Sequence, residues 1–218
     1  RSKPMAGEPA PGLHVVATPI GNLADVTLRA IETLAAADVI ACEDTRVTSK
    51  LLRAHGITTP MTSYHEHNAA RAGPGLLRRL ADGQTIALVS DAGTPLISDP
   101  GFKLVREAAI RGFHVSAVPG ASAPLMALVL SGLPSDRFFF TGFLPPRQAA
   151  RRAELAHLAA IEATLVILES PRRLAAALAD MSEILGRRDV CVARELTKLH
   201  EELRRGVLAD VAAHYRDA

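Results

Sequence analysis

The first half of the chain alternates short apolar runs with longer amphipathic segments. Short apolar runs favour buried strands, which are expected at residues 13–18, 39–43, 61–64, 85–90 and 114–118. Segments whose apolar positions recur every three to four residues favour helices, which are expected at residues 25–36, 45–55, 68–82 and 102–111. Strands that alternate with helices in this way predict right-handed crossovers and a parallel sheet.

Local signals refine several of these elements. The helix over residues 25–36 should face the sheet with Leu28, Ile31, Leu34 and Ala35. Gly56 should end the second helix as a C-cap glycine, and Gly73-Pro74 should interrupt the third one. The run over residues 85–90 is strongly apolar, as expected of a central parallel strand that is covered on both faces.

The pattern changes after Pro119-Gly120. Further helices are expected at residues 123–130, 151–160, 172–185 and 208–215, and further strands at residues 137–142, 164–169, 190–195 and 201–207. Phe138–Phe140 should lie in the core, with a base-stacking platform as the alternative. We therefore expect an α/β protein with a flexible tail at residues 1–12, a mostly parallel domain at 13–121 and a domain with a mixed sheet at 122–218.

The composition is that of an ordinary soluble globular protein, with 48% apolar and 22% charged residues. Residues 1–12 lack the apolar segment of a secretory signal, and no apolar run is long enough to span a bilayer. The two cysteines, Cys42 and Cys191, lie far apart in apolar runs, which excludes a zinc knuckle or a CxxC redox pair. We therefore expect a cytoplasmic protein without a membrane anchor.

The charge balance says little by itself about partners. The net charge is only +2, but just four of the 25 basic residues are lysines, and many arginines stand in adjacent pairs. The planar fork of arginine suits phosphate recognition, which makes an RNA-binding surface conceivable. Scattered arginine pairs are equally typical of a solvated surface.

Three glycine-containing loops follow predicted strands of the first domain, at residues 18–23, 90–95 and 119–122. Ligands of open α/β sheets bind at the edge where the carboxyl ends of the strands meet. Glycine permits close approach of the backbone to a ligand, and these loops add hydroxyl, amide and carboxylate groups. The first loop is not a GxGxxG motif and the chain has no phosphate-binding P-loop, which argues against nicotinamide enzymes and standard P-loop NTPases.

Eight segments of the chain carry a family resemblance. They are ATPIGNL (17–23), CEDTR (42–46), HEHN (65–68), LVSDAGTP (88–95), GLPSDRF (132–138), GFLP (142–145), Glu169-Ser170 with Arg173, and ARELTK (193–198). In this order, over roughly residues 13–200, they resemble the bacterial ribosomal RNA small-subunit (cytidine-2′-O)-methyltransferase family.

The resemblance implies two domains of the tetrapyrrole-methylase type, with S-adenosylmethionine in a cleft between them. It also implies a homodimer that modifies a cytidine in the 16S ribosomal RNA of the small ribosomal subunit. Porphyrinoid methylases of this fold have a GxGxGD loop after the first strand, where this chain has TPIGN, as the RNA-modifying branch does. The family pattern continues into a further strand after the last residues of this sequence, so we expect the second domain to lack that strand.

The loops and the resemblance together predict the cofactor-binding residues. Asp91 should help to hold the amino-acid moiety of S-adenosylmethionine, and an Asx-turn that only shapes its loop is an equal alternative. Thr94 and Pro95 should wall the site, while the resemblance implies that Ala193 and Leu196 line the adenine pocket. The full expected set is Pro19, Gly21, Ser90, Asp91, Ala92, Thr94, Pro95, Ser122, Ala123, Ala193 and Leu196.

Transfer of a methyl group to a ribose hydroxyl is an in-line displacement, which needs alignment and a base or polarising contact. The candidate catalytic residues are Asp44, Arg46 and His67. Asp44 or Thr45 could instead cap the following helix, and His65 or His67 could be a structural hydrogen-bonding histidine. An HxH pair without a third ligand is thin evidence for a metal, so we expect none.

Arg147, Arg151 and Arg152 follow the GFLP segment and predict a phosphate-contact cluster, because positions 147 and 151 of a helix share a face. Arg173 and Lys198 could extend this cluster, and ordinary surface charge is the alternative. Two other functions stay open. One is methylation of a porphyrinoid or a protein side chain on the same fold, and the other is a non-catalytic nucleotide-binding regulator.

Overall fold

The chain folds into two compact units, the first of which ends at Ser122 and the second of which begins at Ala123. A computed structural model describes residues 9–97 and 101–217. Both units combine helices with strands, so the predicted α/β class is confirmed. Residues 1–8 of the predicted tail lie outside the described residues, and Gly12 already belongs to the first strand.

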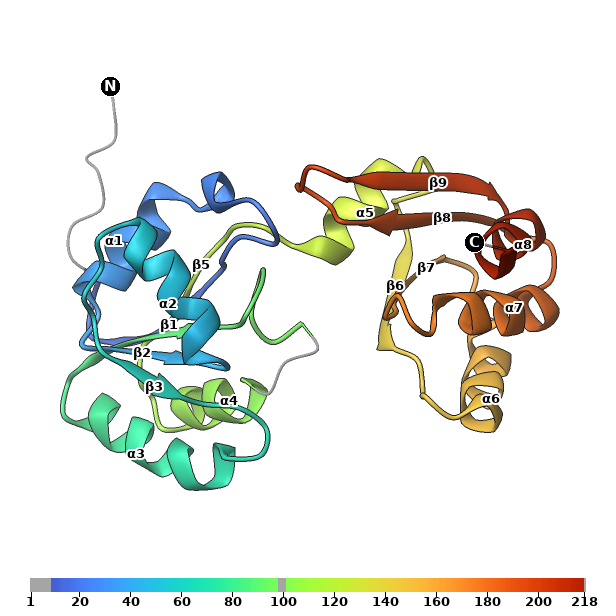
Figure 1. The fold of residues 1–218 in the computed structure, drawn as a ribbon. Coiled ribbons are helices and arrows are strands. Elements are labelled where there is room, and N and C mark those ends of the chain that lie inside the picture. The colour runs from blue at the N-terminus through green and yellow to red at the C-terminus, as the bar shows by residue number, and fades with distance from the viewer. Residues whose placement is uncertain (1–8, 98–100, 218) are drawn as a thin grey trace. The chain divides into compact units, whose positions relative to one another are not determined.

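A parallel sheet forms the centre of the first unit, and five of its strands lie within the described residues (Figure 1). They are β1 (Gly12–Val16), β2 (Val39–Cys42), β3 (Met61–Ser63), β4 (Thr85–Val89) and β5 (Val115–Val118). Their order is β3-β2-β4-β1-β5, with every pairing parallel. All five residues of β4 are buried, as expected of a central strand.

Helices cover both faces of this sheet. The helical segments are η1 (Leu23–Asp25), α1 (Leu28–Ala36), α2 (Thr45–Ala54), α3 (Ala69–Ala81) and α4 (Phe102–Ile110). Ala87 and Val89 of β4 pack in one core cluster with α1 and α2, whereas Ile86 and Leu88 pack in another with α3 and α4. This alternation follows from the two-residue period of a strand, and Figure 1 shows the two helix pairs on opposite sides of the sheet.

Two predictions about the helices of the first unit are wrong in detail. The buried residues of α1 are Ala30, Thr33 and Leu34, whereas Leu28 is 73% exposed and Ala35 is exposed too. The helix begins only at Leu28, after the cap Thr27, so its inner face is one turn shorter than the pattern suggested. Helix α3 continues through Pro74 without interruption, because Gly73 has no Cβ to clash with the proline ring.

The second unit holds four helices and four strands within the described residues. They are α5 (Ala123–Ser131), β6 (Phe138–Phe143), α6 (Gln148–Leu158), β7 (Thr164–Leu168), α7 (Leu174–Leu185), β8 (Asp189–Arg194), β9 (Glu202–Val207) and α8 (Leu208–Asp217). Strand β6 pairs with β7 in parallel, and β8 pairs with β9 antiparallel. Both kinds of pairing expected of a mixed sheet are present, but they form two separate two-stranded sheets.

Phe138 and Phe139 do not lie in the core, contrary to the sequence prediction. They are 45% and 42% exposed, because β6 pairs only with β7 among the described strands and therefore lies at an edge. The core of this unit is built instead by Leu144, Leu155, Leu178 and their neighbours on α6, α7 and α8. No helix in the described ranges is long and apolar enough to cross a membrane.

Candidate active site

The carboxyl ends of neighbouring strands bring the predicted loops together. Strands β2, β4, β1 and β5 stand side by side in that order, and they are followed by the segments 43–46, 90–95, 17–22 and 119–122. Because every pairing in the sheet is parallel, these segments all leave the same edge. This edge, which we call the ligand edge, holds most of the predicted cofactor-binding and catalytic residues.

Hydrogen bonds tie three of these loops directly to one another. Thr18 and Gly93 exchange both of their backbone hydrogen bonds, each with an N···O distance of 3.0 Å. Thr94 Oγ1 donates to the carbonyl oxygen of Ala121 at 3.0 Å. The loops after β1, β4 and β5 therefore form one connected cluster, which contains Pro19, Gly21, Ser90, Asp91, Ala92, Thr94, Pro95 and Ser122.

Two glycines allow the loops to come this close. Gly93 has a φ of +78°, and a Cβ atom there would lie 3.1 Å from Ile20 Cγ2 and 3.4 Å from the carbonyl oxygen of Ala121. A Cβ atom at Gly120 would lie 2.9 Å from the Cβ of Ala17. A larger residue at either position would push the loops apart, which is the physical reason for glycine here.

Ser90 and Asp91 both have structural partners in the loop cluster. Ser90 is 5% exposed, and its hydroxyl donates to the carbonyl oxygen of Ala92 at 3.2 Å. Asp91 Oδ1 accepts a hydrogen bond from the amide of Asp44 at 3.0 Å, which joins the loop after β4 to the one after β2. The Asp91 carboxylate thus braces two strand ends, a role that sequence reasoning did not anticipate.

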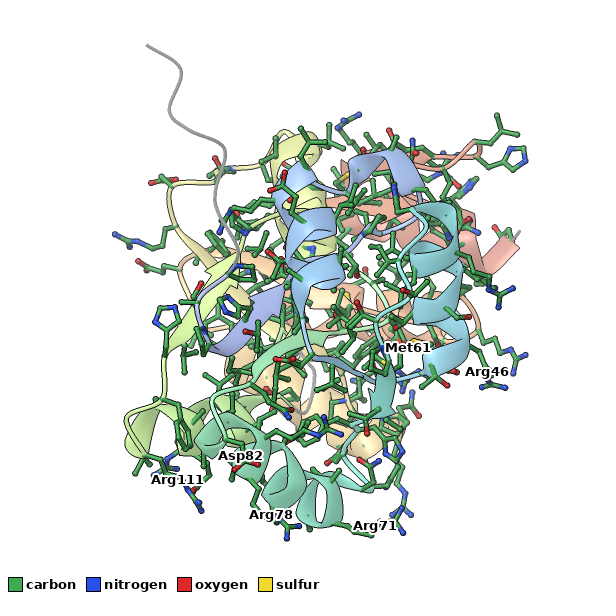
Figure 2. The ribbon with its side chains drawn as sticks, turned by 90° about the vertical axis from the view of Figure 1, so that its left-hand side faces the viewer. Arg46, Met61, Arg71, Arg78, Asp82 and Arg111 are labelled. Atoms are coloured by element: carbon green, nitrogen blue, oxygen red, sulfur yellow. The ribbon has the colours of Figure 1, made fainter. Side chains whose placement is uncertain are left out.

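Asp44 and Arg46 form an ion pair at the start of α2. Asp44 Oδ1 accepts a hydrogen bond from the amide of Arg46 at 2.8 Å, so the helix-capping role is confirmed for Asp44. The Arg46 guanidinium lies 2.7 Å from Asp44 Oδ2, and its hydrogen bond lowers the pKa of Asp44 to about 2. Arg46 is 88% exposed and extends outward from α2 (Figure 2).

His65, His67 and Asn68 follow β3, next to β2. Asn68 accepts from the amide of His65 at 2.8 Å and donates to the carbonyl of Ser63 at 3.0 Å, so its side chain holds this turn together. His67 is exposed, whereas Nδ1 of His65 is buried with no hydrogen-bond partner among the described residues. In the described ranges, no group of three or more His, Cys, Asp or Glu side chains is arranged to hold a metal ion.

The second unit contains the residues predicted for the adenine moiety. Ala193, Leu196 and Ala123 line a hollow of about 250 Å³ between β7 and β8. Leu196 lies in a strained turn, because its neighbours Glu195 and Thr197 have positive φ angles of 50° and 68°. Strain of this kind persists only where the surrounding structure enforces it, and no motif in the sequence predicts it.

The predicted phosphate-contact cluster is largely neutralised by acidic residues of its own unit. Arg151 is 5% exposed, and its guanidinium lies 2.6 Å from the buried carboxylate of Asp180. Arg151 is therefore a buried structural residue, contrary to the prediction that it contacts RNA. Arg152 pairs with both Asp180 and Glu183, whereas Arg147 is exposed just before α6.

Arg173 and Lys198 also have acidic partners. Arg173 lies 2.8 Å from Glu169 Oε1, and Lys198 lies 3.1 Å from Glu195 Oε1. The Glu169 side chain is only 5% exposed and forms an ion pair with Arg173, four residues later in the chain. The sequence motif that contains Glu169 did not predict this role. The partner of a basic residue was not readable from the sequence, because these pairs depend on how turns and helices pack.

Comparisons with known proteins agree with this architecture. The family model of the tetrapyrrole (corrin/porphyrin) methylases matches residues 12–212. The chain is 58% identical to the ribosomal RNA small subunit methyltransferase I of Mesorhizobium japonicum, over 95% of this chain and 71% of that one. It is 52% identical to the protein of the same name from Halalkalibacterium halodurans, over 94% of this chain and 71% of that one.

Solved structures of low sequence identity share the fold. A diphthine synthase superposes with a TM-score of 0.70 at 17% identity, covering 92% of this chain and 83% of that one. A cobalt precorrin-4 methyltransferase of cobalamin biosynthesis gives a TM-score of 0.66 at 15% identity, covering 94% and 89%. The chain is therefore a methyltransferase that belongs to the tetrapyrrole (corrin/porphyrin) methylase family, in the branch of the ribosomal RNA small subunit methyltransferases I.

Proposed function

We propose that the chain transfers a methyl group from S-adenosylmethionine to the ribose 2′-hydroxyl of a cytidine in the 16S ribosomal RNA of the small subunit. The observation that carries this proposal is the 44–58% identity to proteins named ribosomal RNA small subunit methyltransferase I. The choice of a cytidine and of its 2′-oxygen rests on the sequence motifs that resemble the (cytidine-2′-O)-methyltransferase family.

The loop cluster at the ligand edge suits the cofactor. Its loops are packed so closely at Gly93 and Gly120 that a Cβ atom at either position would press on Ile20 or Ala17 of the loop after β1. We assign cofactor contacts to Pro19, Gly21, Ser90, Asp91, Ala92, Thr94, Pro95 and Ser122 of this cluster, and to Ala123, Ala193 and Leu196 of the second unit. S-adenosylmethionine supplies an electrophilic methyl group, and the task of these residues is to align it with the attacking hydroxyl.

The catalytic candidates differ in what they can do. A carboxylate with a pKa of about 2 is a weak base near neutral pH, so Asp44 is better suited to hold Arg46 than to remove a proton. Arg46 is exposed and presents a guanidinium that can contact a phosphate. His67 is exposed and carries an imidazole, the side chain that most often serves as a general base, which makes it the group we propose for the ribose proton.

The RNA partner is proposed to contact the second unit at Arg147, Arg173 and Lys198, with Arg152 contributing less because two carboxylates share it. As the family resemblance implies, we also propose that the protein acts in the cytoplasm as a homodimer. Light scattering tests the homodimer: a mass of two chains supports it, and a mass of one chain contradicts it.

Methyl transfer from radiolabelled S-adenosylmethionine tests the function directly. The acceptors are small ribosomal subunits that lack the modification, naked 16S ribosomal RNA and a porphyrinoid, assayed in parallel. Label in the RNA of the subunits, with none in the porphyrinoid, is the expected result. Label in the porphyrinoid alone, or cofactor binding without transfer to any acceptor, would contradict the proposal.

A further inference from the structure

Six of the twelve basic residues of the first unit lie on two neighbouring helices. Helices α3 and α4, taken with their caps over residues 69–82 and 101–111, carry six basic side chains and two carboxylates. The whole chain has a net charge of only +2, so these two helices alone are more positive than the complete molecule. An asymmetry of this kind is the electrostatic signature expected of a surface that binds nucleic acid.

Most of this charge is not neutralised within the structure. The basic residues Arg71, Arg78, Arg79, Lys103, Arg106 and Arg111 are all exposed. Arg111 pairs with Glu107 at 3.7 Å, and Arg79 donates to Gln84 at 3.1 Å. No acidic side chain within the described ranges pairs with the other four, which sets them apart from the neutralised arginines 151 and 152 of the second unit.

The arrangement on the helices costs stability. Lys103 and Arg106 stand three residues apart on α4, and like charges at this spacing destabilise a helix. Arg71 and Arg78 stand two turns apart on the same face of α3, and Figure 2 shows both side chains extending away from the unit. An anionic partner would offset the repulsion between these basic side chains, which accounts for their presence on one surface.

The two helices lie together and begin at the ligand edge. Both pack on the same core cluster, through Leu76 of α3 and Leu104 of α4, and they contact each other. Asn68, just before α3, bonds to Ser63 of β3. Gly101, just before α4, packs so tightly that a Cβ atom there would lie 3.0 Å from Leu96 Cγ. Arg71 and Lys103, in the first turns, are therefore the members of the set closest to the loop cluster.

An exposed aromatic side chain accompanies these charges. Phe102, the first residue of α4, is 61% exposed, although a phenylalanine usually lies in a core. It directly precedes Lys103 and stands one helical turn before Arg106. Exposed aromatic side chains among basic residues stack with unpaired nucleobases, and this stacking strengthens binding of single-stranded RNA.

We infer that the outer face of α3 and α4 binds the RNA of the small subunit beside the target nucleotide. Arg71, Arg78, Lys103 and Arg106 contact backbone phosphates, and Phe102 stacks on a base. We call this the α3–α4 surface. The inference rests on the proposed function, because it takes the same RNA as the partner, but it places the contact on the unit that carries the catalytic candidates.

The test compares charge-matched double variants. Arg71→Gln with Arg78→Gln removes two charges from α3, and Lys103→Gln with Arg106→Gln removes two from α4. The control, Lys50→Gln with Arg53→Gln, removes two exposed charges from α2 on the opposite side of the sheet. Affinity for subunits that lack the modification is measured at several salt concentrations, and affinity for S-adenosylhomocysteine verifies that each variant is folded.

Each of the two test variants should bind subunits about tenfold more weakly and reduce the slope of log K against log salt by about 1.5, because two phosphate contacts are lost. The control should keep both the affinity and the slope. Phe102→Ala should weaken binding about tenfold with the slope unchanged, since stacking releases no counterions.

Three results would overturn the inference. The first is a test variant with the affinity and slope of the control. The second is binding of the wild-type protein to phosphatidylserine vesicles, lost in the test variants, while subunit binding is unchanged in them. The third is a wild-type protein that binds no subunits at any salt concentration, and this outcome alone would also remove the proposed function.

Discussion

At the scale of single residues, close approach at the ligand edge depends on glycine. Gly93 has a positive φ angle, and its backbone exchanges two hydrogen bonds with Thr18. A Cβ atom at Gly93 would lie within 3.4 Å of the carbonyl oxygen of Ala121. A positive φ angle costs a non-glycine residue roughly 1–2 kcal/mol, but that cost applies to any such glycine. What distinguishes Gly93 is the lack of space for a Cβ atom.

Gly93→Ala should therefore weaken binding of S-adenosylhomocysteine and lower stability, because the Cβ atom would press on Ile20 and on the carbonyl of Ala121. Gly83→Ala is the matched control: Gly83 has a φ of +75°, and nothing lies within 4 Å of a Cβ atom there. Urea denaturation should show a lower stability for both variants, because alanine must adopt a positive φ angle in each. Calorimetry should show a lower affinity for S-adenosylhomocysteine only in Gly93→Ala. Equal affinities of the two variants would remove Gly93 from the cofactor site.

The ion pair at the start of α2 makes a second residue-scale prediction. Arg46→Gln should raise the pKa of Asp44 from about 2 towards the ordinary aspartate value of about 3.9, since the guanidinium hydrogen bond is its main cause. The rise should be incomplete, because the Arg46 amide bond is retained. An NMR titration of the Asp44 carboxyl measures it, with Arg53→Gln as the control.

The sign of the pH dependence follows from the same shift. Because the folded-state pKa of Asp44 is depressed, its stabilising contribution is present above about pH 4 and is lost as the pH falls towards 2. Arg46→Gln should reduce this acid-dependent loss of stability. A carboxyl pKa that does not move in the variant would show that another group depresses it.

At the scale of elements, a buried ion pair joins α6 to α7. Asp180 on α7 is 2% exposed, and burial alone would raise its pKa. Hydrogen bonds from Gln148, Arg151 and Arg152 more than offset this and hold the pKa of Asp180 below its usual value. The buried ion pair therefore connects the two helices, and removal of one partner would leave a buried charge uncompensated, which strongly destabilises a protein.

Arg151→Met should destabilise the second unit by about 3–5 kcal/mol, because it removes the buried partner of a buried carboxylate. Arg152→Gln should cost about 1 kcal/mol or less, since Arg152 is 38% exposed. Chemical denaturation followed by circular dichroism measures both. An Arg151→Met variant of unchanged stability but reduced RNA affinity would instead restore the original RNA-binding interpretation.

The helices and strands were largely predictable from the sequence, whereas the residues that each of them buries were not. TIALVS predicted a buried central strand because its apolar residues have no polar alternation, and β4 is buried throughout. Periodicity assigned Leu28 to the core, but the position of the Thr27 cap decides where α1 begins. Three phenylalanines in a row suggested a core strand, but exposure at β6 depends on which strands pair with it.

The candidate site could likewise be predicted only in part. Parallel strand ends predicted that the three glycine-containing loops would share an edge, and the bonds from Thr18 to Gly93 and from Thr94 to Ala121 join them. The sequence could not show that Asp91 bonds to the amide of Asp44, since the two are 47 residues apart. Contacts of this range depend on the packing of the whole sheet rather than on any local signal.

At the scale of the whole molecule, the basic residues serve two different purposes. The arginines that sequence spacing favoured, Arg151 and Arg152, are used to hold the second unit together. Arg71, Arg78, Lys103 and Arg106 of α3 and α4, by contrast, pair with no acidic side chain within the described ranges, and they belong to the first unit, which also carries the loop cluster. A methyltransferase that acts on RNA needs both functions, a stable scaffold and free positive charge near the reacting group.

The position of the transferred methyl group tests the central claim most directly. Radiolabelled S-adenosylmethionine and small subunits that lack the modification are incubated with the protein, and the labelled RNA is then hydrolysed with alkali. We expect label in an alkali-resistant dinucleotide that begins with cytidine, because a 2′-O-methyl group blocks cleavage of the adjoining phosphodiester. Label released as an ordinary mononucleotide would place the methyl group on a base and contradict the claim.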